Sequence, residues 1–247
     1  MSLPVLVVKV GTSTLLDAYD RPVSTFDVVA QSIRELTNRY RIVLITSGAI
    51  GFGVQHLGIK ERPNDVSQLQ ALSMLGQVGL MERWNAAFGE QAVGQVLLTR
   101  HDLKEADESA LLVDGIKAMW RYGALPVVNE NDAVSSDEIS FGDNDRLAAE
   151  VAVRLRAEAL VLLTDQDGIQ ADFGAVTQRR IAQATIEQAA GHITADTSGA
   201  GTGGASSKLE AARIALAGEV HTYIAHAAHP AAIQRAIAGA AGTKIVQ

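Results

Sequence analysis

Cysteine is absent from the chain of 247 residues, and its absence excludes several chemistries at once. Disulfides, thiolate metal sites and a cysteine nucleophile all require a thiol, so none of them is available. A chain without cysteine also fits the reducing conditions of the cytosol, and we expect a cytoplasmic protein.

Aromatic residues, blocks of positive charge and long apolar runs are also scarce. Phe, Trp and Tyr make up only 4% of the chain, so the core must be aliphatic. The formal net charge is -7 and no block of Lys and Arg occurs, which argues against nucleic acid as a partner. No apolar run approaches the roughly 20 residues of a membrane helix, and the run at residues 3–10 is too short for a secretion signal. We therefore expect no membrane segment and no leader.

The sequence does contain a regular alternation of short apolar segments with longer amphipathic ones. The short segments predict strands at residues 3–10, 41–46, 92–98, 125–128, 159–163, 220–225 and 243–246. The longer ones predict helices at residues 24–40, 66–88, 108–122, 146–156, 181–192, 207–217 and 231–238. In the second of these helices, the predicted buried face consists of Leu69, Leu72, Leu75, Val78 and Met81. The pattern is typical of an α/β fold, a three-layer αβα sandwich with an open, mainly parallel central sheet.

Ligands of such sheets bind beyond the carboxyl ends of the strands. Polar or glycine-rich segments follow four of the predicted strands, at residues 11–14, 46–53, 129–132 and 164–168. Two further stretches interrupt the alternation: residues 130–145 could form a hairpin over the site, and residues 195–207 form a glycine-rich loop.

Lys9 lies in an otherwise apolar strand. A buried ammonium group is costly unless an anion meets it, so Lys9 could face a phosphate, with donors from residues 11–13 beside it. The alternative is an edge strand whose lysine reaches water.

The segment at residues 46–53 reads TSGAIGFG and leads into a helix. Small residues allow close backbone approach, and a helix N-terminus offers free N–H groups to a carboxylate or phosphate. The alternative is a tight turn in which Ser47 only caps the helix.

Asp143, Asn144 and Asp145 precede another predicted helix, with further acidic residues upstream at 132, 137 and 138. Helix capping is one explanation, because acidic residues stabilise a helix start. The carboxylates could also hold an ammonium group or a metal ion, or orient lysines. A calcium loop does not fit, since the order of acidic residues required by an EF-hand is missing.

The last two candidate segments lie in the second half of the chain. Thr164 and Asp165 could contact a nucleotide, although the following Asp-Gly also suggests a plain turn. Residues 199–204 match the dinucleotide pattern G-x-G-x-x-G, but no strand precedes them directly, and the segment is not a Walker A motif. What remains is a loop whose backbone N–H groups, together with Lys208, could hold phosphates; a linker without a site is the alternative.

Taken in order, these segments resemble the amino acid kinase family, and within it the kinases that phosphorylate glutamate. The segments that carry the resemblance are VVKVGTSTL (7–15), TSGAIGFG (46–53), LLTR (97–100), NENDAV (129–134), FGDND (141–145), LTDQDG (163–168) and GTGGASSKLEAA (201–212). The chain departs from the family between Gly168 and Gly199, where a Tyr-Thr and an Asp-Pro are missing, so the adenine contacts stay unassigned.

The resemblance implies a single kinase domain over residues 1–247, with glutamate bound by the N-terminal part, ATP by the C-terminal part, and no C-terminal RNA-binding-type (PUA) domain. It implies that Lys9 and Lys208 embrace the transferring phosphoryl group while Asp145 orients both. The implied glutamate-binding residues are Ser47, Asn129, Asp132, Asp143 and Asn144. The implied ATP-binding residues are Lys9, Thr164, Asp165, Thr202, Gly203, Gly204, Ala205, Ser206, Ser207 and Lys208.

The activity implied is ATP-dependent phosphorylation of the side-chain carboxylate of L-glutamate, the first step of proline biosynthesis. Mg2+ would sit on the ATP phosphates, with no protein side chain as its ligand. The resemblance also implies a homo-oligomer, proline as a feedback inhibitor and the next enzyme of the pathway as a partner. A kinase for another small carboxylate and a non-catalytic amino-acid sensor of the same fold are the alternatives.

Overall fold

The structure is a computed structural model, and it describes residues 3–16, 24–135, 144–172, 174, 177–192 and 204–247. Its strands are β1 (Val5–Val10), β2 (Arg41–Ile45), β3 (Val93–Leu98), β4 (Leu125–Glu130), β5 (Ala159–Thr164), β6 (Gln170–Ala171), β7 (Arg179–Arg180), β8 (Gln183–Thr185), β9 (His221–His226) and β10 (Thr243–Val246). Its helices are α1 (Thr12–Leu16), α2 (Thr25–Arg34), α3 (Ala49–His56), α4 (Val66–Phe88), α5 (Arg100–Lys104), α6 (Ala106–Arg121), α8 (Asp145–Arg154), α9 (Ile186–Ala190), α10 (Ala205–Ala217) and α11 (Ala232–Ile237).

Eight strands form the main sheet, in the order β3-β4-β2-β1-β5-β9-β10-β8. All neighbours pair in parallel except β9 and β10, and β6 pairs with β7 in a separate antiparallel ribbon. The first strand is central, since Lys9 lies opposite Ile45 of β2 and Leu162 of β5. The predicted open, mainly parallel sheet is confirmed.

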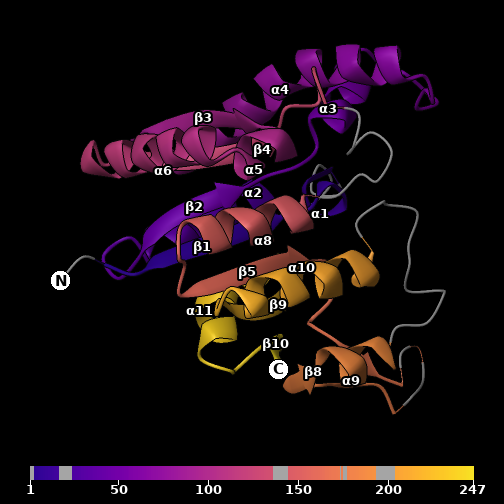
Figure 1. The fold of residues 1–247 in the computed structure, drawn as a ribbon. Coiled ribbons are helices and arrows are strands. Elements are labelled where there is room, and N and C mark those ends of the chain that lie inside the picture. The colour runs from indigo at the N-terminus through magenta and orange to yellow at the C-terminus, as the bar shows by residue number, and fades with distance from the viewer. Residues whose placement is uncertain (1–2, 17–23, 136–143, 173, 175–176, 193–203) are drawn as a thin grey trace.

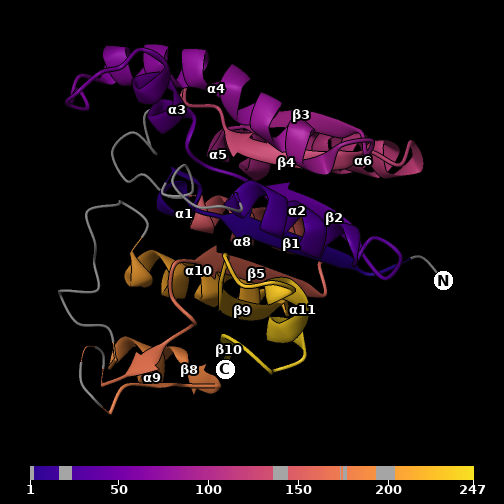
Figure 2. The ribbon, with the colours of Figure 1, turned by 180° about the vertical axis from the view of Figure 1, so that it is seen from behind.

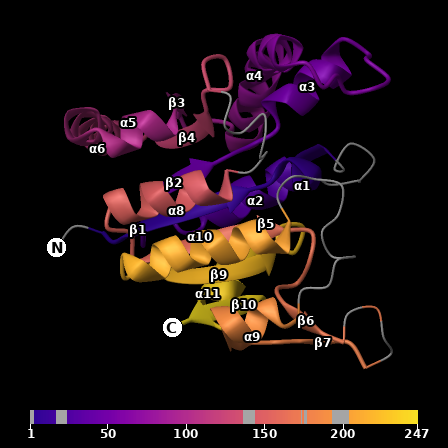
Figure 3. The ribbon, with the colours of Figure 1, turned by 45° about the vertical axis from the view of Figure 1, so that its right-hand side comes forward.

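Helices cover both faces of the sheet and give three layers (Figure 1). Helices α6, α8 and α10 lie on one face, while α2, α4 and α11 lie on the other (Figure 2). A view turned by 45° shows α8 and α10 running side by side along the sheet (Figure 3). The carboxyl ends of the central strands therefore open toward the starts of α8 and α10.

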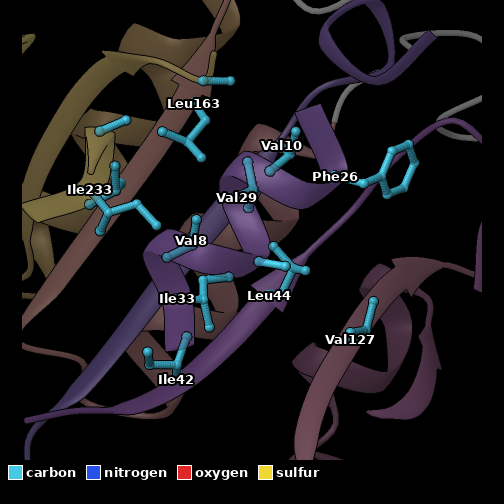
Figure 4. Packing of buried hydrophobic residues seen from close by; sticks show 14 of the residues in the cluster. Val8, Val10, Phe26, Val29, Ile33, Ile42, Leu44, Val127, Leu163 and Ile233 are labelled. Atoms are coloured by element: carbon cyan, nitrogen blue, oxygen red, sulfur yellow. The ribbon is translucent and has the colours of Figure 1, made fainter. Parts of the chain in front are cut away.

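Successive side chains of β1 point to opposite faces of the sheet and so contribute to both hydrophobic cores. Val8 and Val10 point into the core under α2, where Val29, Ile33 and other aliphatic residues surround them (Figure 4). Val7 joins the second core, under α8 and α10, and Lys9 points the same way because it lies two residues on. Both cores are mostly aliphatic, as the low aromatic content requires.

Local signals fix several helix starts. The side chain of Ser24 accepts a hydrogen bond from the Phe26 N–H before α2, and Asp65 accepts one from the Gln68 N–H before α4. Before α3, the turn passes through Gly48 with φ of 108°, a backbone conformation that favours glycine. Ser47 is thus not the cap of α3.

Two predictions about elements are corrected. The helix predicted at residues 181–192 is instead the short strand β8 followed by α9, because Gln183–Thr185 pairs with β10 at the sheet edge. The bounds of α4 match the prediction, but Leu75 and Val78 on its predicted inner face are 48% and 62% exposed. The true inner face includes Leu69, Leu72, Gly76, Leu80 and Trp84.

No helix among the described residues combines the length and the apolar character that a bilayer-spanning segment needs.

Candidate functional site

One buried carboxylate joins the two lysines that the sequence singles out. The ammonium nitrogen of Lys9 lies 2.6 Å from Oδ1 of Asp145, and that of Lys208 lies 3.0 Å from Oδ2. Lys9 is 2% exposed, Lys208 is 7% exposed and Asp145 is fully buried. Because charges are costly to bury unless they are paired, this arrangement explains how two ammonium groups can lie inside the protein. Lys9 is therefore not the lysine of an edge strand.

The three residues come from separate elements. Lys9 is near the end of β1, Asp145 opens α8, and Lys208 lies in the first turn of α10. Packing of α10 along α8 brings Lys208 to Asp145, although 63 residues separate them in sequence. The predicted convergence of Lys9, Asp145 and Lys208 is present in the structure.

Ser207 also contacts this carboxylate. Its hydroxyl oxygen lies 3.0 Å from Oδ2 of Asp145 and 2.8 Å from the carbonyl oxygen of Gly204. The sequence assigned Ser207 to ATP, whereas here its hydroxyl lies beside the carboxylate that holds the lysines. Its proposed contact with ATP stays a prediction.

A chain of amide hydrogen bonds lies next to Asp145. The side-chain nitrogen of Asn144 donates to the carbonyl oxygen of Thr46, at 2.6 Å, and to Oδ1 of Asn129, at 2.7 Å. Since a backbone carbonyl can only accept, the nitrogen of the Asn144 amide must face Thr46. The carbonyl oxygen of this amide therefore points elsewhere.

Two buried polar atoms in this region have no hydrogen-bond partner among the described residues. They are Oδ1 of Asn144 and the hydroxyl oxygen of Ser47. Asn144 is fully buried, and Ser47 is 7% exposed. Buried polar groups are normally hydrogen-bonded, so each of these atoms is a candidate contact for a bound polar ligand. Asp132 is buried in the turn after β4 and belongs to the same end of the sheet. An ammonium group would satisfy the Asn144 oxygen, and the Ser47 hydroxyl can donate or accept.

Apart from Lys9 on β1, the predicted ATP-binding residues that the structure describes lie at the end of β5 and at the start of α10. Thr164 ends β5 and its hydroxyl donates to Oδ1 of the exposed Asp165, at 3.1 Å. Gly204, Ala205 and Ser206 form the N-terminus of α10, whose backbone N–H groups suit a phosphate. These positions and the glutamate-side residues flank the two lysines from opposite halves of the chain.

Three predicted site residues, Asp143, Thr202 and Gly203, lie outside the described residues, as do residues 136–143 of the expected hairpin at residues 130–145. Their roles stay predictions. Among the described residues, no group of three or more His, Asp or Glu side chains is placed to hold a metal ion.

The sequence pattern gave no indication of two residues that support this site, Gln77 and Trp84, and it included Thr46 only as the first residue of the segment 46–53. Gln77 accepts a hydrogen bond from Nδ2 of Asn129, at 2.8 Å, and the Trp84 indole donates to the Thr46 hydroxyl, at 2.9 Å. A correct inner face for α4 would have identified Trp84 as buried and placed Gln77 beside that face, four residues after Ser73 and three before Leu80.

Solved structures show how widespread this fold is. A carbamate kinase from Giardia lamblia bound to AMP-PNP aligns with a TM-score of 0.67 at 15% identity, over 99% of each chain. A uridylate kinase from Archaeoglobus fulgidus aligns with a TM-score of 0.62 at 15% identity, over 98% of this chain and 99% of that one. At such low identity these similarities show the fold alone.

Sequence relatives are closer. A glutamate 5-kinase from Gloeobacter violaceus is 40% identical over 97% of this chain and 67% of its own length. The glutamate 5-kinase from Clostridium acetobutylicum is 36% identical over 93% of this chain and 89% of its own, and that from Streptomyces avermitilis is 42% identical over 92% and 63%. The chain thus spans about two thirds of the length of the Gloeobacter and Streptomyces relatives.

The model of the amino acid kinase family matches residues 4–226, which include Lys9, Asp145 and Lys208. The match covers most of the chain. The chain therefore belongs to the amino acid kinase family, and its relatives within that family are glutamate 5-kinases.

Proposed function

We propose that this chain transfers the γ-phosphoryl group of ATP to the side-chain carboxylate of L-glutamate, the first step of proline biosynthesis. The observation that carries the proposal is the convergence of Lys9 and Lys208 on Asp145, beside an unsatisfied amide oxygen of Asn144. The similarity to glutamate 5-kinases over most of the chain supports the same assignment.

The chemistry requires positioning and charge neutralisation more than covalent catalysis. An oxygen of the glutamate carboxylate attacks the γ-phosphorus, the bond from that phosphorus to the β,γ-bridging oxygen breaks, and ADP leaves. The carboxylate is already ionised at neutral pH, so no general base is needed. Lys9 and Lys208 would therefore neutralise the negative charge of the transferring phosphoryl group by contacting its oxygens, while Asp145 fixes the positions of both lysines.

Recognition of glutamate would use its α-ammonium end, opposite the side-chain carboxylate that reacts. Its ammonium group would donate to Oδ1 of Asn144 and approach the Asp132 carboxylate, while Ser47 would take a further polar contact. Asp143 and Asn129 complete the proposed set. On this proposal, residues 1–247 form a single domain whose N-terminal part would bind glutamate and whose C-terminal part would bind ATP.

ATP would bind as its Mg2+ complex, with the metal supplying further neutralisation of phosphate charge. The N-terminus of α10 and Lys208 offer donors that fit a phosphate group. Proline as an inhibitor, a homo-oligomer, cytoplasmic location and contact with the next enzyme of the pathway are expectations that follow from the family resemblance.

The test is an acyl-phosphate trap. The chain is incubated with ATP and Mg2+ in the presence of hydroxylamine, and hydroxamate and ADP are measured with glutamate, N-acetylglutamate, aspartate and uridylate. We expect hydroxamate with glutamate and none with N-acetylglutamate, because acetylation removes the ammonium group that Asn144 and Asp132 would bind. Equal turnover of N-acetylglutamate would contradict the substrate assignment.

The same assay separates the alternatives. Preferential turnover of aspartate would indicate a kinase for another small carboxylate. Tight glutamate binding by calorimetry without any ADP release would indicate a sensor. A third alternative is a nicotinamide-dependent oxidoreductase, suggested by the G-x-G-x-x-G pattern at residues 199–204. That pattern binds a dinucleotide when a strand leads directly into it, and here α9 stands between β8 and the pattern in the sequence, so this alternative is not favoured. Micromolar binding of NAD would support it.

A further inference from the structure

We propose that Gln77 and Trp84, on helix α4, are positioning residues that hold the amide of Asn144 in the orientation needed for substrate. The inference rests on the proposed function, because it concerns the residue that would receive the glutamate ammonium group. Neither residue needs to touch a substrate for this role.

The Asn144 amide has two acceptors, and α4 holds both. The first acceptor, the carbonyl oxygen of Thr46, belongs to a residue whose hydroxyl accepts the Trp84 indole N–H at 2.9 Å. The second, Oδ1 of Asn129, belongs to an amide whose nitrogen donates to Oε1 of Gln77 at 2.8 Å. A single helix thus secures both sides of one buried donor.

The direction of every bond in the Gln77 branch is set by backbone groups. Oδ1 of Asn129 accepts from the backbone N–H of Glu130 at 3.0 Å, so this atom must be the oxygen. The nitrogen of the same amide then faces Gln77, which must present its oxygen there. The nitrogen of Gln77 is left to donate to Oε1 of the exposed Gln95, at 3.0 Å. Gln77 therefore completes the orientation that leaves Oδ1 of Asn144 available.

The Trp84 branch is anchored in the core. Trp84 is fully buried and packs on Phe26, with ring centroids 4.5 Å apart, and on Phe88, at 5.9 Å. Its indole nitrogen has a fixed position, so the Thr46 side chain at the end of β2 is fixed with it. The carbonyl of Thr46 and the following Ser47 are placed by the same contact.

Gln77→Met is the principal test, since methionine keeps the length and loses the acceptor, and since Gln77 is only partly buried. Losing one net hydrogen bond should raise the KM for glutamate by roughly fivefold. The kcat should stay within about twofold and the KM for ATP should not change, because a misplaced Asn144 amide weakens glutamate binding equally in the ground and transition states.

Gln95→Met is the matched control. It makes the same chemical change in the same side-chain pair, yet it leaves the contact between Gln77 and Asn129 intact. Its glutamate KM should equal that of the wild type. An equal rise of the glutamate KM in Gln95→Met and Gln77→Met would overturn the proposal. The hydrogen bond between Gln77 and Gln95, which both variants remove, would then explain the effect without Asn129.

A double variant tests whether Gln77 acts through Asn129. In an Asn129→Ala background, Gln77→Met should have no additional effect on the KM for glutamate, whereas independent effects would multiply. If the two KM increases multiply in full, the proposed route through Asn129 is wrong.

For the second branch, Trp84→Phe keeps an aromatic ring and removes the indole N–H, and it should raise the glutamate KM about two- to fivefold without changing kcat. An unchanged KM in a folded Trp84→Phe protein would remove Trp84 from the proposal.

Failure of this inference differs from failure of the proposed function. Wild-type protein that turns over glutamate, with a Gln77→Met variant of unchanged KM, overturns only the positioning role. Wild-type protein that forms no hydroxamate with glutamate overturns both.

Discussion

The ammonium group of Lys9 contacts Oδ1 of Asp145 while that of Lys208 contacts Oδ2, so one carboxylate separates two buried positive charges. Two ammonium groups and one carboxylate leave one net positive charge among these three side chains. An anionic phosphoryl group bound beside them would balance it. This relationship makes Asp145 an organiser of the lysines and gives the first prediction.

Asp145→Asn should mainly lower kcat, by roughly 10²–10³-fold if the loss resembles that of other preorganised groups. Asparagine has almost the same shape, so the change removes charge without creating a cavity. The two lysines then repel each other and lose their fixed positions. Steady-state kinetics at saturating ATP measure the effect, and circular dichroism at the assay temperature verifies that the variant is folded.

Glu150→Gln is the control for Asp145→Asn. Glu150 lies on the same helix, and its pair with Arg146, at 2.9 Å, is on the surface, where such pairs contribute about 0–1 kcal/mol. We expect normal kcat for this variant. A near-normal kcat for Asp145→Asn would show that Asp145 only stabilises the start of α8.

Asp143→Asn should act differently and raise the KM for glutamate while kcat is largely retained. Asp143 lies outside the described residues, so this prediction rests on the sequence resemblance, which assigns Asp143 to the substrate ammonium group. Removal of a contact made only with substrate weakens ground and transition states alike. Kinetics with varied glutamate at saturating ATP decide it, and a selective fall in kcat would place Asp143 with the lysines instead.

Much of the fold follows from local patterns in the sequence. The central strands were predictable because both of their faces are buried, and the bounds of α4 because Asp65 caps its start and Gly89 follows its end. The edge of the sheet was less predictable. Strand β8 is three residues long, and only its pairing with β10 distinguishes it from the start of a helix. The inner face of α4 was also misassigned, since Leu75 and Val78 fit the same apolar spacing as the buried residues.

The site shows a similar division. The family motifs predicted that Lys9, Asp145 and Lys208 act together, and strand parity explains why Lys9 points toward α8. The support from α4 carries no motif, because Gln77 and Trp84 act through the geometry of side-chain amides and an indole across elements. Such contacts depend on how α4 crosses the sheet, which the sequence pattern alone does not determine.

Tyr40→Phe should reduce stability at neutral pH, and the reduction should fade in alkali. Burial, together with a hydrogen bond to Glu158 at 3.1 Å, raises the pKa of the Tyr40 phenol above its usual range. A raised folded-state pKa stabilises the protein below the unfolded value of about 10, and this stabilisation is lost as pH rises through the folded value. We expect a cost of about 1 kcal/mol at pH 7. Urea unfolding from pH 7 to 11 measures it, with the wild type as reference because Tyr223, whose pKa is also raised, is present in both. A pH-independent difference would contradict the assignment.

Gly76→Ala should destabilise the protein and weaken glutamate binding together, because α3 and α4 cross in contact at this residue. A Cβ at Gly76 would lie 1.9 Å from the Ala49 carbonyl oxygen and 2.3 Å from the Gly53 nitrogen, so backbone would have to move. Overpacking of this kind costs about 1–3 kcal/mol, and the forced shift of α3 would displace the turn that holds Ser47. Gly115→Ala on α6 is the matched control, since a Cβ there meets nothing within 4 Å and should be neutral or stabilising by up to about 1 kcal/mol. Urea unfolding and the glutamate KM of both variants test the prediction. If Gly76→Ala lost stability and kept its KM, the position of α3 would not control the substrate site.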